Sequence, residues 1–348
     1  MGGRIDELDR KIVELLAKRC GEHIEELKAL PPGEALYSAA RARELSDFLE
    51  SLELGPLSAD IVKRIFSELS AFAVSAVRPP TVAYLGPAGT FTHSAMLDIF
   101  GASATGVAVK SIHDIFLEVE TGRAQFGVVP VENSTEGAVT YTLDELMETE
   151  LKITAEKYLR VTYSLVSVAK DMKKIKKLYS HPQSFGQCKE WIRKNLPDAE
   201  LHNVSSTSLA AETASWDKLA AAVTSHASAE IYGLNVLATN IEDSRQNYTR
   251  FFVIGERDNP PTGRDKTSII CAVRDKPGAL YDLLGPFDQA GINMTKIESR
   301  PDKKKMWEYN FFIDFIGHRE NTIVKSAVEK MKEDLIFLKV LGSYPAEK

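Results

Sequence analysis

The sequence has few cysteines and no long apolar run. Only Cys20, Cys188 and Cys271 occur in 348 residues, and no two of them have a paired spacing. An odd, scattered set of thiols excludes a disulfide framework and offers no zinc-ligand pattern, so we predict no metal site. No stretch approaches the roughly 18 apolar residues of a membrane helix, and the first residues lack the apolar core of a signal peptide. These absences predict a cytoplasmic protein with reduced thiols and no membrane partner.

An excess of positive charge is also missing. Lysine and arginine number 43 against 49 aspartates and glutamates, which gives a net charge of -6. An acidic balance excludes nucleic acid as the main partner. Neither a Walker lysine nor a Gly-x-Gly-x-x-Gly fingerprint is present, so we predict no nucleotide and no other cofactor. The length predicts two or three domains.

The first 80 residues have the pattern of three helices. Apolar residues recur at helical spacing from Ile5 to Leu16, a second helical stretch covers 39–52, and Ser58 is a plausible N-cap for a third. So thin a bundle is expected to bury its apolar stripe best against a second copy of itself.

This head resembles the all-helical chorismate mutase domain. The matching motifs are Ile5-Asp6-x-x-Asp9, Leu15-Leu16-x-x-Arg19 and Arg41 to Glu44. The resemblance implies rearrangement of chorismate to prephenate, with Arg19 and Arg41 at family arginine positions and Lys28 two residues from the family lysine position.

Several family positions are changed in this head. The early helix-1 arginine falls at about Gly2, the acid at Ser38, and the late Ser and Gln at Ala73 and Val77. A valine cannot donate a hydrogen bond to the ether oxygen of chorismate. We therefore expect a degenerate head that dimerises or regulates, with an active mutase as the alternative.

The middle of the chain repeats the order strand, polar turn, helix. Such turns follow predicted strands at Gly86–Thr92, Glu132–Ser134, Ser180–Gln183, Ser205–Thr207 and Thr224–Ser225. The repetition predicts α/β lobes that bind a small anion at the carboxyl ends of their strands. For each single Ser, Thr or Asn, helix capping is the alternative.

The hexapeptide Asn247-Tyr248-Thr249-Arg250-Phe251-Phe252 places a hydroxyl and a guanidinium side by side at the mouth of an apolar strand. Thr249 can donate a proton, and Arg250 can clamp a carboxylate. A solvated arginine at the rim of a sheet is the alternative.

Five motifs, in order, resemble those of prephenate dehydratases over residues 81–255. They are Gly86-Pro87-x-Gly89-Thr90-Phe91-x-x-x-Ala95, Pro130-Val131-Glu132-Asn133-Ser134, Ser180-His181-Pro182-Gln183-x-x-x-Gln187-Cys188, Ser206-Thr207 and Asn247-Tyr248-Thr249-Arg250-Phe251. The resemblance implies two α/β lobes like those of type-2 periplasmic binding proteins, with the active site in the cleft between them. It also implies loss of carbon dioxide and water from prephenate to give phenylpyruvate.

The resemblance assigns roles within that cleft. Thr249 assists departure of the hydroxide, and Arg250 either binds a substrate carboxylate or pairs with Glu132. The other expected substrate-binding residues are Asn133, Ser134, Ser180, Gln183, Gln187, and more weakly Thr90, Ser206 and Thr207. We expect a structural role for His181. Tyr163-Ser164 stands where the family often has histidine, a change at the cleft wall without a clear functional meaning.

The tail follows the polar linker 258–263 and has the βαββαβ order of a ferredoxin-like fold over residues 267–343. It resembles the ACT domain of prephenate dehydratases, which implies feedback inhibition by phenylalanine bound between paired subunits. The matching, expected effector-binding residues are Gly278, Ala279 and Leu280, and Glu298, Ser299 and Arg300. A turn glycine and a surface ion pair are the alternatives for these two segments.

Together these features predict a multidomain chain: an all-α head at 1–78, a two-lobed α/β domain at 81–256, and an α+β ferredoxin-like domain at 266–345. A homodimer or homotetramer is expected. Two rival functions stay open: a non-catalytic sensor of an amino acid or keto acid, and an enzyme that decarboxylates prephenate without making it aromatic. Retention of Thr249 argues against the second.

Overall fold

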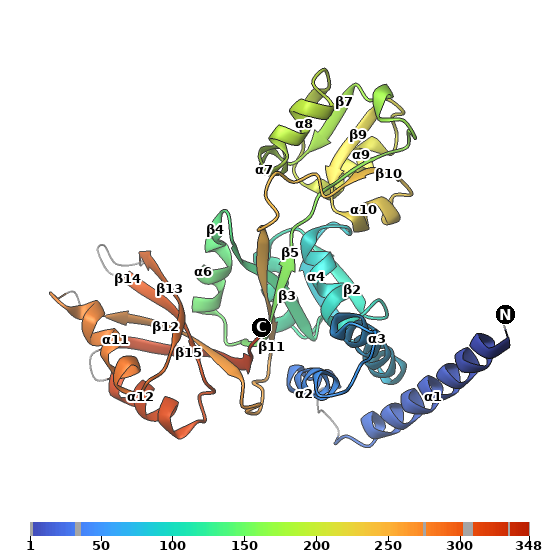
Figure 1. Ribbon diagram of the computed structural model, residues 1–348. Helices are drawn as coiled ribbons and strands as arrows, with labels where there is room; N and C mark the ends of the chain where they lie inside the picture. Colours follow the sequence, from blue (N-terminus) through green and yellow to red (C-terminus); the bar gives the residue numbers. More distant parts are fainter. Residues whose placement is uncertain (1–2, 32–35, 274–275, 302–308, 333–334, 348) are drawn as a thin grey trace.

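The computed structural model describes residues 3–31, 36–273, 276–301, 309–332 and 335–347, which form a helical head, two α/β lobes and a C-terminal α+β domain (Figure 1). The expected three-part fold class is confirmed. Within the described residues, no helix combines the length and the apolar character needed to cross a bilayer.

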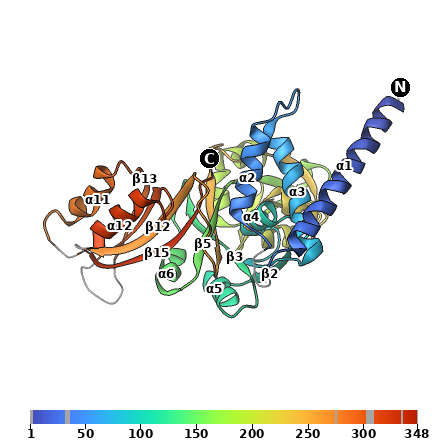
Figure 2. The same ribbon diagram turned by 90° about the horizontal axis from the view of Figure 1, so that it is seen from below.

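The head consists of α1 (Gly3–Lys28), α2 (Ala39–Glu50) and α3 (Ala59–Val77), as the helical spacing predicted. Ser38 and Ser58 cap α2 and α3 by accepting backbone N–H bonds. The first half of α1 extends away from the rest of the molecule (Figure 2), so Ile5, Leu8 and Leu15 are more than half exposed. Gly2, the position of the missing family arginine, lies outside the described residues.

The first lobe is a mixed sheet with strand order β2-β1-β3-β11-β5, and β4 pairs with β3. Its strands are β1 (Thr81–Leu85), β2 (Thr105–Val109), β3 (Phe126–Asn133), β4 (Gly137–Ala138), β5 (Lys152–Arg160) and β11 (Tyr248–Gly255). Its helices are α4 (Phe91–Phe100), α5 (Ile112–Glu120) and α6 (Thr140–Glu148). The helix after the Gly86 turn thus begins at Phe91, three residues before the predicted start near Ser94, because Thr90 caps it.

The second lobe is a sheet with strand order β10-β6-β9-β7-β8. Its strands are β6 (Ser164–Ser167), β7 (Lys177–Ser180), β8 (Glu200–Asn203), β9 (Ala220–Thr224) and β10 (Asn235–Thr239). Its helices are the short 3-10 turn Met172–Lys174, α7 (Pro182–Gln187), α8 (Lys189–Asn195), α9 (Thr207–Ala214) and α10 (His226–Ile231). The chain crosses between the lobes twice, after β5 and before β11 (Figure 1).

The C-terminal domain is a four-stranded sheet in the order β13-β14-β12-β15. Its elements are β12 (Asp265–Val273), α11 (Ala279–Gln289), β13 (Met294–Pro301), β14 (Tyr309–Ile316), α12 (Thr322–Lys332) and β15 (Leu335–Pro345), which is the predicted βαββαβ order. One face of the sheet packs on α11 and α12. The other face packs on the first lobe, where Phe312 and Tyr344 share a core with Phe252.

Candidate active site

The start of β11 carries the predicted proton donor. β11 lies between β3 and β5, and its first rungs pair Thr249 with Asn133 and Arg250 with Glu132. Asn133 Nδ2 donates to Thr249 Oγ1 at 2.9 Å. In the described part of the chain Thr249 gives its own proton to no protein acceptor, so the hydroxyl can donate to a ligand. The structure brings together Thr249 and Asn133, as predicted.

Asn133 orients Thr249 and has no hydrogen-bonding capacity left for substrate. Its second amide proton goes to Asn247 Oδ1 at 2.8 Å, while its carbonyl oxygen accepts the backbone N–H groups of Thr135 and Glu136. Because both protons and the acceptor are engaged, this amide is fixed in one orientation. In this arrangement Asn133 positions Thr249, and its expected contact with substrate stays a prediction.

A row of amides continues from Thr249 into the second lobe. Asn247 Nδ2 donates to Gln187 Oε1 at 2.8 Å, at the end of α7. Thr249, Asn133, Asn247 and Gln187 therefore form a continuous hydrogen-bonded row across the boundary between the lobes. Within the described residues no acceptor is found for the Gln187 Nε2 protons, so they can donate to a ligand. Asn247 begins the same hexapeptide as Thr249, but sequence reasoning did not give it a role.

Arg250 faces away from this row, so the prediction that it binds substrate or pairs with Glu132 is wrong. Successive side chains of a strand point to opposite faces. The guanidinium is buried against Glu156 of β5, with Nε and Nη2 at 2.9 and 2.7 Å from Oε2, and against Asp314 of the C-terminal domain. Burial alone would lower the pKa of Arg250, but Tyr344, Asp314 and Glu156 together raise it above its ordinary value.

Glu132 also faces the C-terminal domain. Its carboxylate is paired with Lys296 of β13 at 2.9 Å. Glu132 still belongs to β3, which continues to Asn133, two residues beyond the predicted end of that strand. Alternation along this longer strand turns Glu132 away from Asn133 and from the amide row. The expected substrate-binding role of Glu132 is not supported by its position.

Several predicted donors are used for local structure. Thr90 donates to the Leu85 carbonyl and caps α4, and Ser180 is fully buried and donates to the Val223 carbonyl at 2.6 Å. The Ser134 hydroxyl donates to the Gln246 carbonyl and accepts the backbone N–H of Tyr248. For Thr90, Ser134 and Ser180 the structure shows capping or bracing contacts, and their expected contact with substrate stays a prediction.

His181 also serves local structure. Its Nδ1 accepts the backbone N–H of Gln183, so His181 caps α7, the structural role that we expected. This bond uses the only acceptor nitrogen of a neutral imidazole.

The remaining predicted donors of the second lobe stand at strand ends with free protons. Gln183 is exposed in the first turn of α7. Ser206 caps α9 as an acceptor, which leaves its proton free, and Thr207 is buried with no hydrogen-bond partner found in the described part of the chain. Thr224, which belongs to a predicted polar turn but was not among the expected site residues, lies at the end of β9 and has a buried Oγ1 with no hydrogen-bond partner among the described residues.

The glycine turn of the first lobe is docked on three serines of the second. The Gly89 carbonyl accepts from Ser225 Oγ at 2.8 Å and Ser228 Oγ at 2.9 Å, and the Ala88 carbonyl accepts from Ser208 Oγ. The lobes are therefore closed on each other at this turn. Each serine lies at or within one turn of a helix start, where capping is the ordinary role, so this contact between the lobes could not be predicted from the serines alone.

Replacing Gly89 with alanine is expected to prevent this closure. Gly89 has φ +88°, and an added Cβ would lie 2.7 Å from Ser228 Oγ and 3.0 Å from Ser208 Oγ. We expect the affinity for substrate to fall at least about tenfold, because closure completes the site. Steady-state kinetics measure this as a raised KM. The control is Gly122→Ala, which has a similar φ of +70° but nothing within 4 Å of the new Cβ, and whose kinetics should not change.

Tyr163 and Ser164 are both buried where the second lobe begins. The Tyr163 ring contacts Phe91 of α4 edge-on, with centroids 5.6 Å apart, so this contact also joins the two lobes. Burial raises the pKa of Tyr163 to about 12, which keeps the phenol neutral at physiological pH. The departure from the family histidine thus replaces a titratable group by an apolar interlobe contact.

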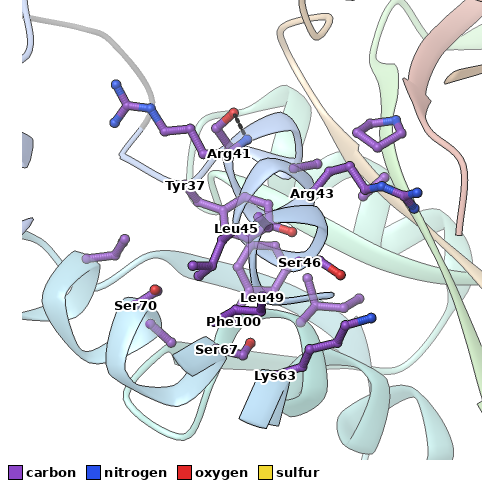
Figure 3. Close-up of a pocket in the computed structure, with 18 of the residues that line it drawn as sticks. Tyr37, Arg41, Arg43, Leu45, Ser46, Leu49, Lys63, Ser67, Ser70 and Phe100 are labelled. Carbon is purple, nitrogen blue, oxygen red and sulfur yellow. Dashed lines mark hydrogen bonds between the residues drawn. The ribbon is translucent and has the colours of Figure 1, made fainter. Parts of the chain in front are cut away.

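Two of the mutase-like residues, Arg19 and Arg41, line a separate pocket of about 1070 Å³ between the head and the first lobe (Figure 3). Arg19 Nη2 donates to Ser70 at 3.2 Å, and its Nη1 is buried with no hydrogen-bond partner among the described residues. Arg41 extends from α2 in the opposite direction to Arg43 (Figure 3), and it is exposed. Lys28 pairs with Glu25 on the surface of α1 and is not among the residues that line this pocket, so its mutase-like role stays a prediction.

The expected effector segments start from the same end of the C-terminal sheet, because Ala272 at the end of β12 and Arg300 of β13 both pair with Asn310 of β14. Gly278, with φ +83°, precedes α11, whose first turn holds Ala279 and the exposed Leu280. Glu298, Ser299 and Arg300 lie on the edge strand β13. Arg300 forms an ion pair with Asp144 of α6 at 3.1 Å. Its guanidinium therefore faces the first lobe, and this ion pair occupies the group that was expected to bind an effector.

Comparison with known proteins gives the family. The family model "Prephenate dehydratase" matches residues 82–259, "ACT domain" matches 267–333, and "Chorismate mutase type II" matches 2–75. The bifunctional chorismate mutase/prephenate dehydratases of Aquifex aeolicus and Pseudomonas aeruginosa are 45% and 42% identical, over 98% of this chain and 96% of each relative.

A solved structure of similar fold is also a prephenate dehydratase. Prephenate dehydratase from Arthrobacter aurescens, crystallised in complex with L-Phe, has a TM-score of 0.71 and 33% identity over 76% of this chain and 90% of its own. Its sequence identity supports more than a shared fold. The chain therefore belongs to the prephenate dehydratase family, in the three-domain arrangement with a chorismate mutase-type head and a C-terminal ACT domain.

Proposed function

We propose that this chain converts prephenate to phenylpyruvate at the amide row, with Thr249 as the hydrogen-bond donor to the departing hydroxide. The observation that carries the proposal is the geometry of Thr249: its oxygen accepts from Asn133, and no acceptor for its proton is found among the described residues. Asn133 fixes the hydroxyl from one side, and the amide row holds Asn133 in turn. A donor held in this way is preorganised for charge that develops in the transition state.

The reaction needs little more than orientation and this donor. The bond to the ring carboxylate breaks, its electron pair enters the ring, and the ring carbon–oxygen bond breaks to release hydroxide. Aromatisation supplies the driving force. A threonine hydroxyl is a weak acid, but its hydrogen bond strengthens as negative charge grows on the leaving oxygen, and this lowers the barrier.

The substrate carboxylates are bound by neutral donors and helix N-termini. With Arg250 on the opposite face, the row itself contains no cation. The first turns of α4 and α9 approach each other where Ser208 meets the Ala88 carbonyl. The positive ends of two helix dipoles therefore lie near Thr207, the first residue of α9, which is a favourable setting for a carboxylate.

One assay tests this function and its regulation. Purified protein receives prephenate, with and without phenylalanine, and formation of the aromatic keto acid is followed. We expect turnover in both, slower with phenylalanine, since coupling between such sites typically amounts to about 1–3 kcal/mol. Binding of prephenate without any keto acid would favour the sensor alternative. A non-aromatic decarboxylated product would favour the other rival.

The same assay with chorismate tests the head. We propose that the head has no mutase activity at an ordinary enzymatic rate, because Ala73 and Val77 replace the polar side chains of the family. Ala73 is fully buried, which leaves no room there for a donor. Rapid loss of chorismate would support the alternative, a bifunctional enzyme like the relatives from Aquifex and Pseudomonas.

The oligomeric state and the cellular location are proposals as well. We propose a homodimer or homotetramer with phenylalanine bound between paired C-terminal domains. Support comes from two unpartnered surfaces: the apolar stripe of α1, and β13, which is an edge strand with Ile297 44% exposed. The three free cysteines support a reducing, cytoplasmic location.

A further inference from the structure

The C-terminal domain forms an ion pair with Arg250, the residue next to Thr249 in the sequence. Asp314 and Glu156 bind the Arg250 guanidinium from two sides, and all three side chains are at most 3% exposed. Water does not screen ion pairs at such a depth, and the guanidinium has donors at fixed angles. The position of Arg250, and with it the start of β11, is therefore set by these two carboxylates.

Asp314 is itself held rigidly by its own domain. It accepts a hydrogen bond from Ser268 of β12, and the hydroxyls of Ser268 and Tyr344 share a bond of 2.7 Å. Arg250 Nη2 lies 3.1 Å from the Tyr344 hydroxyl. Three strands of the C-terminal sheet, β12, β14 and β15, thus contribute to one binding site for a side chain of the catalytic domain.

The same domain also holds the partner strand. Glu132 is directly opposite Arg250 in the β3–β11 ladder, and Lys296 of β13 binds it at 2.9 Å with a side chain only 8% exposed. Both members of this rung are therefore fixed by the C-terminal domain. The next rung along the same two strands is Asn133 with Thr249.

We propose that Asp314 and Lys296 are positioning residues for the dehydration. They act through Arg250 and Glu132 to fix the rung of Thr249 and Asn133, and a shift of these two contacts is the route by which the C-terminal domain alters turnover. The inference rests on the proposed role of Thr249. A displacement of about 1 Å at a reacting group can cost about 100-fold in rate.

Asp314→Asn tests the proposal. It keeps the size of the side chain and leaves Arg250 paired with Glu156, but it removes one charge that positions the guanidinium. We expect kcat for prephenate to fall about 10-fold to 100-fold, with KM changed by less than about threefold, because a displaced donor weakens the transition state while the second-lobe donors still bind substrate. Lys296→Met, which releases Glu132, should cause a smaller loss of the same kind.

The matched control is Lys339→Met. Lys339 also joins the C-terminal domain to the first lobe, through the carbonyls of Met147 and Thr149, but it contacts neither β3 nor β11. We expect a lower unfolding temperature and an unchanged kcat. If Asp314→Asn does not fold, Ser268→Ala replaces it. This variant removes only the hydrogen bond from Ser268 to Asp314, and kcat should fall several-fold.

The outcomes separate this inference from the proposed function. Unchanged kcat in Asp314→Asn, or in Ser268→Ala when that variant replaces it, overturns the inference alone. So does a loss confined to KM, or an equal loss of kcat in Lys339→Met. Absence of keto acid from the wild-type protein overturns the proposed function instead.

Discussion

Thr249→Val is expected to lower kcat for prephenate about 10²-fold to 10³-fold, the range found when one donor to a developing oxyanion is removed. Valine matches the shape of threonine and favours a strand, so β11 should keep its pairing with β3 and β5. The substitution removes the hydroxyl proton that Thr249 is expected to donate to the leaving oxygen. Initial rates of keto-acid formation, measured with saturating prephenate, give the comparison.

Thr249→Ser is the control for that substitution. Serine keeps the oxygen that accepts from Asn133 and keeps a proton to donate, so most of the rate should remain. KM should change little in either variant, because the hydrogen bond matters mainly once charge has developed on the leaving oxygen. A near-normal rate for Thr249→Val would mean that another group delivers the proton, and the mechanism would need to be rebuilt around that group.

Arg250→Met is expected to have the largest effect on stability, at about 3–5 kcal/mol of unfolding free energy. Methionine fills part of the volume but leaves Glu156 and Asp314 as buried carboxylates without their common partner. Lys266 still compensates Glu156, with Nζ 2.8 Å from Oε1, so the uncompensated charge falls mainly on Asp314. Urea unfolding of the variant and the wild type gives the difference.

Two comparisons make the stability prediction sharper. Adding Asp314→Asn to Arg250→Met removes the stranded charge, so part of the lost stability should return, as expected for groups in direct contact. Arg123→Met breaks a similar two-bond pair, with Glu118, that lies in solvent, and it should change stability little. Equal losses in Arg250→Met and Arg123→Met would contradict the buried-cluster explanation.

Sequence periodicity predicted the architecture well because most elements obey local rules. Two helices of the head, α2 and α3, begin at serine caps, and the alternation of strands and helices predicted both lobes. The C-terminal βαββαβ order was likewise readable from its apolar runs and from Gly278. In each case the signal lies within a few residues of the structure that it predicts.

The site was predicted less completely, because the competing roles depend on contacts distant in sequence. Thr249 and Asn133 were placed together, since both stand at strand ends. Arg250 could not be assigned from its neighbours, because its partner Asp314 lies 64 residues away in another domain. Ser180 and Thr90 carry side chains that suit a ligand and a helix cap equally well, and only their carbonyl partners decide between the two.

The opposite facing of Thr249 and Arg250 has a consequence for how this chain can vary. An insertion of one residue between Arg250 and the apolar run that starts at Phe251 would turn the hydroxyl toward the buried carboxylates and bring the cation into the space for substrate. Chemistry and domain attachment would fail in the same event. The segment is thus intolerant of length changes, even where exchange of one side chain for another would be harmless.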